Sequence, residues 1–374
     1  FLERSTTDDQ GFFYLSPELE VNPAVGRLFI KIRELSGPWV RVRSAGGESF
    51  LYQQPFLPGC IYLLNDPPNS CFTAEVNAFF HFHKARDFLS VYDPDNPLLK
   101  RRFLIEVNSP DLPCNAVYGA GIFTFAKETE DCPNTCFSTV IHHEFAHALL
   151  EEIYRGTVGP SVALSEGLAD SFTVLLNGDP VVARGLGPEG QGRDASKLYR
   201  WPEDLSREDH IAGLIVAGAW WDLRENLRER QGPRGVDLAC KLFFGFLKLK
   251  PLRIEPTLGK LLLFLDDDDG DLSNGTPHYL EIKESFSKHG LMPPPWQKVL
   301  LLHRPIADVP QGASPSVRVR ALGEVRGPIM VRFRVNGGSE HKFELLPQPE
   351  GYFVGKFPSL AQPGIVSYRI EAQD

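Results

Sequence analysis

The residues best suited to chemistry form the segment HHEFAH at positions 142–147. It contains the pattern H-E-x-x-H inside an apolar-periodic stretch that predicts a helix. Positions four apart lie on the same face of a helix, about one turn apart, so His143 and His147 can bind one metal ion. Glu144 projects beside that face, where its carboxylate can take a proton from a metal-bound water. His142 points about 100° away from His143 and is not part of the pair.

A third metal ligand is expected from Glu166, which follows His147 by nineteen positions. The surrounding pattern predicts a second helix that packs beside the first. Asp170 comes about one turn after Glu166, where it can accept the ring N–H of a metal-bound histidine and fix its orientation. Two histidines and one glutamate leave a fourth position for water, which is typical of catalytic zinc. The sequence therefore predicts one Zn²⁺ ion held by His143, His147 and Glu166, in a hydrolase.

These segments resemble the gluzincin metallopeptidases, in particular the thermolysin-like and fungalysin-like families. HEFAH at 143–147 resembles their zinc helix, and EGLAD at 166–170 resembles the helix that carries their third ligand. DHIAG at 209–213 resembles a further helix, whose histidine donates to the oxyanion of the transition state. The resemblance assigns that role to His210. The alternative for His210 is an ordinary histidine at a helix start, beside acidic residues.

The same resemblance implies the reaction and the way in which the substrate binds. It extends roughly over residues 70–290 and implies hydrolysis of a polypeptide by a metal-activated water, with Glu144 as the general base. The segment CNAVY at 114–118 resembles the edge strand that holds the substrate in these families. Asn115 and Ala116 are therefore candidate substrate contacts, and an ordinary turn is the alternative.

Two features separate the chain from the family pattern. Tyr154 is the nearest candidate for the tyrosine that these families place near the zinc, but its register differs. The interval from His147 to Glu166 is one residue shorter than in thermolysin and equals that of the zinc aminopeptidases of the same clan. The G-x-M-E-N motif of those aminopeptidases does not occur in the sequence, which favours an endopeptidase. The alternatives are an aminopeptidase and an adhesion or binding protein with a vestigial zinc site.

A run of acidic residues at 266–271 is dense in oxygen ligands and contains a turn glycine at 270, with a second at 275. Such a composition suits Ca²⁺, so a structural calcium site is one interpretation. The other is a solvated acidic loop that caps the following helix. The candidate calcium ligands are Asp267, Asp269, Asp271 and Asn274.

The six cysteines indicate the compartment in which the chain works. Five lie between positions 60 and 136, in loop-rich sequence, and the chain has two methionines. An even cysteine count in this context favours a secreted protein with disulfides. Cys132 and Cys136 are expected to form a disulfide with each other, and Cys240, in an apolar helical stretch, is expected to be a buried free thiol. The start at Phe1 rather than Met suggests a processed product.

Charge and hydropathy exclude two classes of partner. The chain has 39 Lys and Arg against 48 Asp and Glu, a net charge of −9. A duplex-binding protein would normally show an excess of basic residues, so nucleic acid is not an expected partner. The longest apolar run in a helical context covers residues 211–221, which is too short to span a bilayer.

The elements that must position these residues follow from periodicity. Alternating patterns in the first part and helical spacing in the middle predict an α+β metallopeptidase-type domain over residues 1–300, thermolysin-like by the resemblance. Its β-rich part is 1–136 and its mainly helical part is 137–300. Short strands and regular turns over 306–374 predict a small immunoglobulin-like or fibronectin-like β-sandwich, which could bind a macromolecular target. The expected helices cover residues 73–92, 137–154, 164–176, 207–230, 235–249, 256–265 and 276–289.

Overall fold

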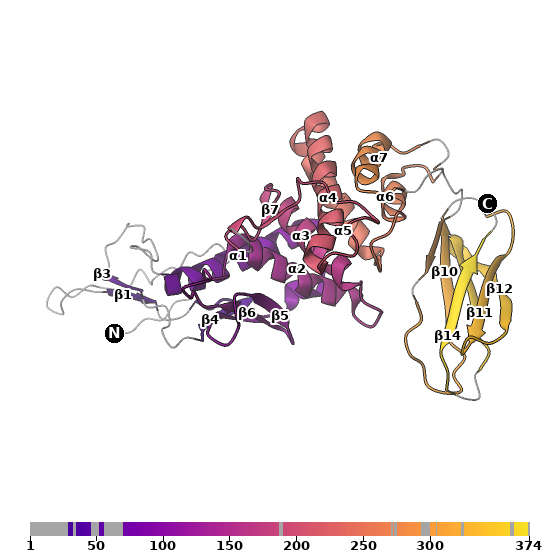
Figure 1. Ribbon diagram of the computed structural model, residues 1–374, viewed down its shortest axis with the longest axis horizontal. Helices are drawn as coiled ribbons and strands as arrows, with labels where there is room; N and C mark the ends of the chain where they lie inside the picture. Colours follow the sequence, from indigo (N-terminus) through magenta and orange to yellow (C-terminus); the bar gives the residue numbers. More distant parts are fainter. Residues whose placement is uncertain are drawn as a thin grey trace, which may run out of the picture. The chain divides into compact units, whose positions relative to one another are not determined.

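The structure is a computed structural model (Figure 1). The chain divides into two units. The first unit comprises residues 1–152 and 165–197, and the second comprises 153–164 and 198–374. The described residues are 29–32, 35–45, 52–55, 70–186, 190–270, 272, 275–292, 300–303, 305–322, 325–359 and 363–372.

A four-stranded mixed sheet underlies the first unit, in the order β2-β4-β6-β5. Strands β2 (Val40–Ser44), β4 (Phe103–Ser109) and β6 (Ile122–Ala126) are parallel. Strand β5 (Ala116–Gly119) is antiparallel to β6 and forms one edge. Strands β1 (Phe29–Ile32) and β3 (Tyr52–Pro55) form a separate antiparallel pair, and β7 (Val181–Val182) pairs with β8 (Arg193–Asp194).

Three helices lie wholly or mainly in the first unit, α1 (Ser70–Tyr92), α2 (Ser138–Tyr154) and α3 (Val162–Asn177), with a 3₁₀ turn at Pro97–Lys100. The end of α2 and the start of α3, within residues 153–164, are assigned to the second unit. Five phenylalanines, one from each of the main elements, join these helices to the sheet. Phe82 of α1 lies 5.3 Å from Phe145 of α2 and 5.6 Å from both Phe103 of β4 and Phe123 of β6, measured between ring centroids. Phe145 stacks on Phe172 of α3 at 5.8 Å. Because Phe145 lies inside HEFAH, the aromatic core fixes the helix that carries the candidate metal ligands.

The second unit contains the helices α4 (Asp209–Gln231), α5 (Pro233–Lys248), α6 (Leu258–Asp266) and α7 (Tyr279–Lys288). Trp220 of α4 is fully buried and makes edge-on contacts with Phe243 and Phe246 of α5 and with Phe286 of α7. The sequence-based helix boundaries agree with the observed ones to within three residues at every end. Mixed helix and strand content confirms an α+β protein, whereas the thermolysin-like architecture stays a prediction.

Six antiparallel strands form the last part of the second unit, in the order β14-β11-β12-β13-β10-β9. They are β9 (Leu300–His303), β10 (Ser316–Leu322), β11 (Ile329–Val335), β12 (Glu340–Gln348), β13 (Tyr352–Lys356) and β14 (Val366–Glu371). The sheet curls around an apolar core that includes Val319, Val331 and Phe357 (Figure 1). His303 of β9 lies 2.7 Å from the Tyr368 hydroxyl of β14, so the curl brings the first and last strands of the order together. The segment is all-β, as predicted, and its immunoglobulin-like or fibronectin-like topology stays a prediction.

The disulfide prediction was wrong in its pairing. Cys132 bonds to Cys114, with the two Cα atoms 5.6 Å apart, a separation suited to a disulfide. Cys136 is buried against α1 instead, where its thiol lies 3.2 Å from the carbonyl oxygen of Ala74. Burial raises the pKa of the Cys136 thiol, which keeps it protonated. Cys240 is a buried thiol on α5, as predicted, and Cys60 lies outside the described residues.

Among the residues that the structure describes, none of the helices combines the length and the apolar character needed to cross a bilayer.

Candidate metal centre

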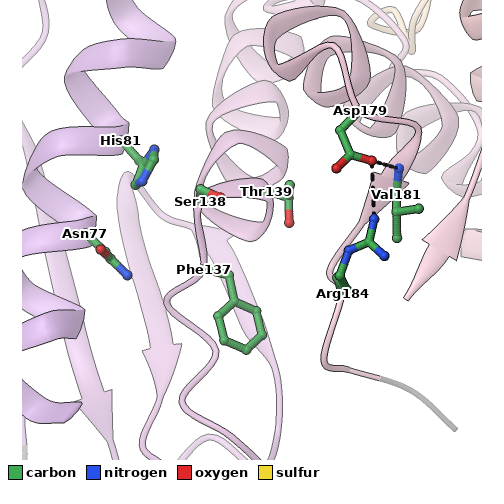
Figure 2. Close-up of a pocket in the computed structure, with 8 residues that line it drawn as sticks. All are labelled: Asn77, His81, Phe137, Ser138, Thr139, Asp179, Val181 and Arg184. Atoms are coloured by element: carbon green, nitrogen blue, oxygen red, sulfur yellow. Dashed lines mark hydrogen bonds and ion pairs between the residues drawn. The ribbon is translucent and has the colours of Figure 1, made fainter. Parts of the chain in front are cut away.

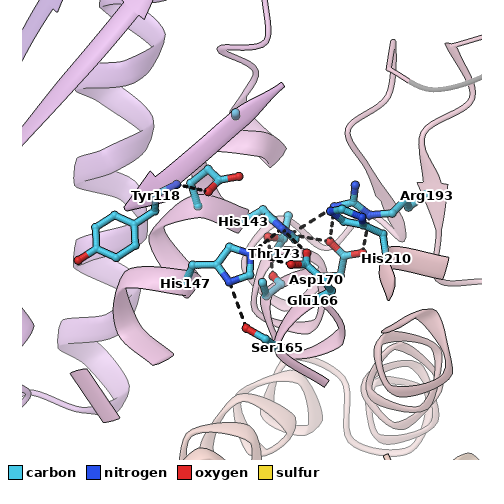
Figure 3. A network of polar contacts seen from close by, with 12 residues as sticks. Tyr118, His143, His147, Ser165, Glu166, Asp170, Thr173, Arg193 and His210 are labelled. Carbon is cyan, nitrogen blue, oxygen red and sulfur yellow. Dashed lines mark hydrogen bonds and ion pairs between the residues drawn. The ribbon is translucent and has the colours of Figure 1, made fainter. Parts of the chain in front are cut away.

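Three side chains from α2 and α3 converge in the first unit (Figure 3). The Nε2 atoms of His143 and His147 lie 3.0 Å apart. The carboxylate of Glu166 lies 3.0 Å from His143 Nε2 through one oxygen and 3.5 Å from His147 Nε2 through the other. The spacing of four on α2 and the packing of α3 beside it therefore bring together the three predicted ligands.

The chemistry of these donors fits a cation between them. The Nδ1 atom of His143 lies 2.7 Å from Asp170, so a neutral, metal-binding His143 ring donates its Nδ1–H hydrogen bond to that carboxylate and presents the Nε2 lone pair to the centre. Two ligands at about 2.0–2.1 Å from a tetrahedral ion are about 3.3 Å apart, close to the three separations observed here. Lone pairs and a carboxylate that face one point at these distances can hold a metal ion.

Asp170 anchors His143 from behind, and Arg193 anchors Asp170. The Asp170 carboxylate is fully buried and accepts hydrogen bonds of 2.8 Å from Nε and 2.7 Å from Nη2 of Arg193. Burial alone would raise the pKa of Asp170, but the Arg193 charge and the bonds to Arg193 and His143 hold it well below its usual range. Asp170 is therefore an anion, as the proposed support for a metal-bound histidine requires.

The same contacts shift the protonation of His143 and Glu166 in the metal-free protein. Burial lowers the pKa of His143, but the hydrogen bond and charge of Asp170 outweigh it and raise that pKa to about 9. Burial raises the pKa of Glu166, but its contacts with His143 and His147 outweigh that effect and lower it. A metal ion entering the centre must therefore displace a proton from His143.

Sequence reasoning missed Arg193. It lies on the two-residue strand β8, twenty-seven positions after Glu166 and beyond a glycine-rich loop. No helical or strand periodicity identifies such a position. The one available signal was chemical: a carboxylate predicted at position 170 to support a metal-bound histidine is stabilised by a nearby cation, and an arginine is the residue best suited to supply one.

Glu144, the predicted general base, is held by the backbone of the sheet. Its Oε2 atom accepts a 2.7 Å hydrogen bond from the Tyr118 N–H of β5 (Figure 3). The residue is 6% exposed, so this donor fixes the carboxylate in a mostly dry environment. Asn115 and Ala116 lie at the start of the same edge strand, where the Asn115 side chain accepts the Ala116 N–H at 2.9 Å.

Tyr154 and His210 belong to the second unit. The Tyr154 ring is buried, and its hydroxyl donates a 2.5 Å hydrogen bond to the carbonyl oxygen of Pro251. These contacts give Tyr154 a structural role within its unit. His210 lies in the first turn of α4, with its side chain 44% exposed and its Nδ1 atom 2.5 Å from the Glu208 carboxylate. The role of His210 at a transition state stays a prediction.

The acidic run begins where α6 ends. Oxygens of Asp267, Asp268 and Asp269 lie within 4.8 Å of one another, a separation that exposed carboxylates also show without an ion. Asp271 and Asn274, the other two predicted calcium ligands, lie outside the described residues. Calcium binding therefore stays a prediction.

A separate cavity of about 370 Å³ lies at the start of α2 (Figure 2). None of the residues predicted for the metal centre lines it. The hydroxyl of Thr139, in the first turn of α2, accepts a hydrogen bond from the Ala183 N–H at 3.0 Å, so this lining group already has a partner within the chain. The lining residues are Asn77, His81, Phe137, Ser138, Thr139, Asp179, Val181 and Arg184.

Comparison with known proteins adds no family to this picture: no protein-family model and no curated protein sequence matches the chain. The resemblance to the gluzincins therefore rests on the motifs and stays a prediction.

Proposed function

We propose that the chain is a secreted, zinc-dependent endopeptidase that cleaves polypeptides with Glu144 as the general base. The observation that carries the proposal is the convergence of His143, His147 and Glu166 at separations of 3.0–3.5 Å, with Glu144 on the next position of the same helix. Zinc is the metal that this set of two imidazoles and one carboxylate, with a position left for water, favours.

Zinc bound by these ligands would supply Lewis-acid polarisation of the scissile carbonyl and of an attacking water. The residues of the chain do the rest. Glu144, oriented by the Tyr118 N–H, takes the proton of the water and passes it to the leaving amine. Asp170 and Arg193 keep the His143 ring in one tautomer and orientation. His210 is assigned to the oxyanion by the family resemblance alone.

Binding of an extended substrate is supported by the position of β5. It is the edge strand of its sheet, the kind of strand with which an extended peptide can pair, and its outward Ala116 and Tyr118 N–H groups are bonded to Asn115 and Glu144, so an added strand would pair through the outward carbonyl groups. The Tyr118 N–H that bonds to Glu144 belongs to this strand, so the strand proposed to bind the substrate lies next to the proposed general base. The disulfide between Cys114 and Cys132 agrees with an oxidising, extracellular environment.

The test is hydrolysis of an internally quenched peptide blocked at both ends, by wild type and by Glu144→Gln. Loss of the general base should lower kcat/KM about 10²–10⁴-fold while the zinc content stays at one per chain. The matched control is Glu130→Gln, an exposed glutamate of the same unit, which should keep wild-type activity. A chelator should abolish activity, and added zinc should restore it.

Two outcomes would contradict the proposal. Equal rates for wild type and Glu144→Gln would exclude this residue as the base. Cleavage confined to peptides with a free amino terminus would replace the endopeptidase with an aminopeptidase.

For His210→Ala, we expect kcat to fall about 10²–10³-fold with the zinc retained, and loss of zinc would mean that His210 is a ligand instead.

A further inference from the structure

The outer face of the curled β9–β14 sheet has an uneven distribution of charge. Side chains alternate across each strand, and the inner positions, such as Val317 and Val319 of β10, form the buried core. The positions between them point outward. On β10 these include Arg318 and Arg320, both exposed, and Arg320 pairs in register with Tyr352 of β13.

One end of this outer face is neutralised by ion pairs across β11, β12 and β14. Arg332 pairs with Glu340 at 3.0 Å and with Glu371 at 2.7 Å. Arg334 lies 3.8 Å from the Glu340 carboxylate, and Arg369 lies 2.7 Å from that of Glu371. Each arginine at this end therefore has an acidic partner.

The opposite end of the outer face, on β13 and β10, carries exposed cations that form no ion pair with the described residues. These are Arg318, Arg320 and Lys356. Together with Tyr352, whose ring lies against the two arginines, we call them the basic stripe. The guanidinium of Arg318 stacks on the Tyr352 ring at 3.9 Å, and that of Arg320 lies 5.7 Å from the same ring centroid. When the β12–β13 register is continued, exposed Glu344 falls across from Lys356, so Lys356 has an acidic neighbour on this face, whereas the positions across from Arg318 and Arg320 on β13 are Val354 and Tyr352.

The distances between the cations of the basic stripe follow from the geometry of the strands that carry them. Arg318 and Arg320 are two residues apart on β10, about 6.7 Å along the strand. Lys356 pairs in register with Ser316, one further step of two residues along the same line. The three cations thus form a row about 13 Å long on the exposed outer face of the sheet. The stacked Tyr352 ring holds the guanidinium groups in place before a ligand arrives, which lowers the entropic cost of binding.

We propose that the basic stripe binds a sulfated polysaccharide. A linear polyanion matches a row of evenly spaced cations, and arginine forks bind oxyanions through two parallel hydrogen bonds. The net charge of the chain is −9, so the field of the whole molecule opposes an anionic partner, and the attraction must come from the local row of cations. A bilayer would call for a larger apolar anchor than the face offers, and duplex DNA for many more cations. This binding does not depend on the proposed peptidase activity.

The test uses the full chain and heparin as the probe, with uncharged dextran as the reference. At 0.15 M NaCl, wild type should bind heparin and not dextran, and its affinity should fall as salt increases. The double variant Arg318→Ser/Arg320→Ser should lose at least tenfold in affinity. The matched control is Arg334→Ser/Arg369→Ser, which removes the same charge from exposed positions of the same face and should change affinity less than threefold.

Other outcomes would overturn the proposal. Equal losses in the two double variants would mean that heparin senses only net charge. Absence of heparin binding by wild type would exclude the ligand, and tighter binding to phosphatidylserine vesicles or duplex DNA would assign the stripe to another partner. The variant Arg318→Lys keeps the charge but removes the planar stack, so it should bind severalfold more weakly than wild type. Circular dichroism of each variant checks that the sheet is intact.

Discussion

The two histidines of α2 face one centre from different surroundings. His143 is 4% exposed and rests on the buried pair of Asp170 and Arg193. The His147 side chain is 20% exposed, and its Nδ1 atom lies 3.3 Å from the Ser165 hydroxyl. One side of the centre is therefore fixed by charge in a dry environment, and the other is held by one long hydrogen bond with a hydroxyl group. The difference teaches that equal positions in a motif need not contribute equally to a metal site.

The largest effect should come from removing the cation behind His143. Arg193→Leu leaves a fully buried carboxylate at Asp170 without its main partner, which should lower the free energy of unfolding by about 3–5 kcal/mol. Urea unfolding of the metal-free protein measures this. The control is Arg184→Leu, which breaks a 3.5 Å pair with Asp179 in which both side chains are at least half exposed. It should cost less than about 1 kcal/mol. A similar decrease in the free energy of unfolding for the two variants would show that the buried Arg193–Asp170 pair stabilises the fold no more than an exposed ion pair does.

The next effect concerns the metal itself. Asp170→Asn keeps the shape of the side chain but removes the negative charge that orients His143 and increases its basicity. Zinc affinity should fall about 10–100-fold, measured by competition with a fluorescent chelator. An unchanged affinity would mean that the buried pair supports the fold and not the metal.

A pH dependence should follow from the raised pKa of His143, about 9 in the metal-free protein. Below that pH the ring holds a proton that zinc must displace, so affinity should rise about tenfold per pH unit from pH 7 to 9 and level off above. The same competition assay at pH 7, 8 and 9 measures the slope. In Asp170→Asn the plateau should begin at a lower pH, because the carboxylate that raises the pKa is gone. A flat profile for wild type would contradict the assigned protonation.

The smallest effect is expected on the exposed side of the centre. Ser165→Ala removes a hydroxyl hydrogen bond at 3.3 Å from His147, which should weaken zinc binding only about twofold to fivefold. A loss as large as that of Asp170→Asn would remove the contrast between the two histidines.

Much of the fold was accessible from the sequence because its helices are long and periodic. All seven helices were predicted at their observed places, since apolar spacing is a local property of the chain. The cysteine pairing was not accessible. Cys132 has candidates at many positions, and only the approach of the β5 start to the loop after β6 selects Cys114. The contact of Arg193 with Asp170 could not be predicted for the same reason, because a two-residue strand after a glycine-rich loop shows no periodicity in the sequence.

The sequence by itself determined the residue types of the centre and their order on two helices. Positions 143 and 147 share a helix face by the geometry of the helix alone, and position 170 follows 166 by one turn. Only the tertiary structure decided which side chains complete the centre. The aromatic core brings α2, α3 and the sheet together, which places Arg193 on Asp170 and the Tyr118 N–H on Glu144. Such contacts depend on how separate elements pack, and packing is set by the whole chain rather than by any local pattern.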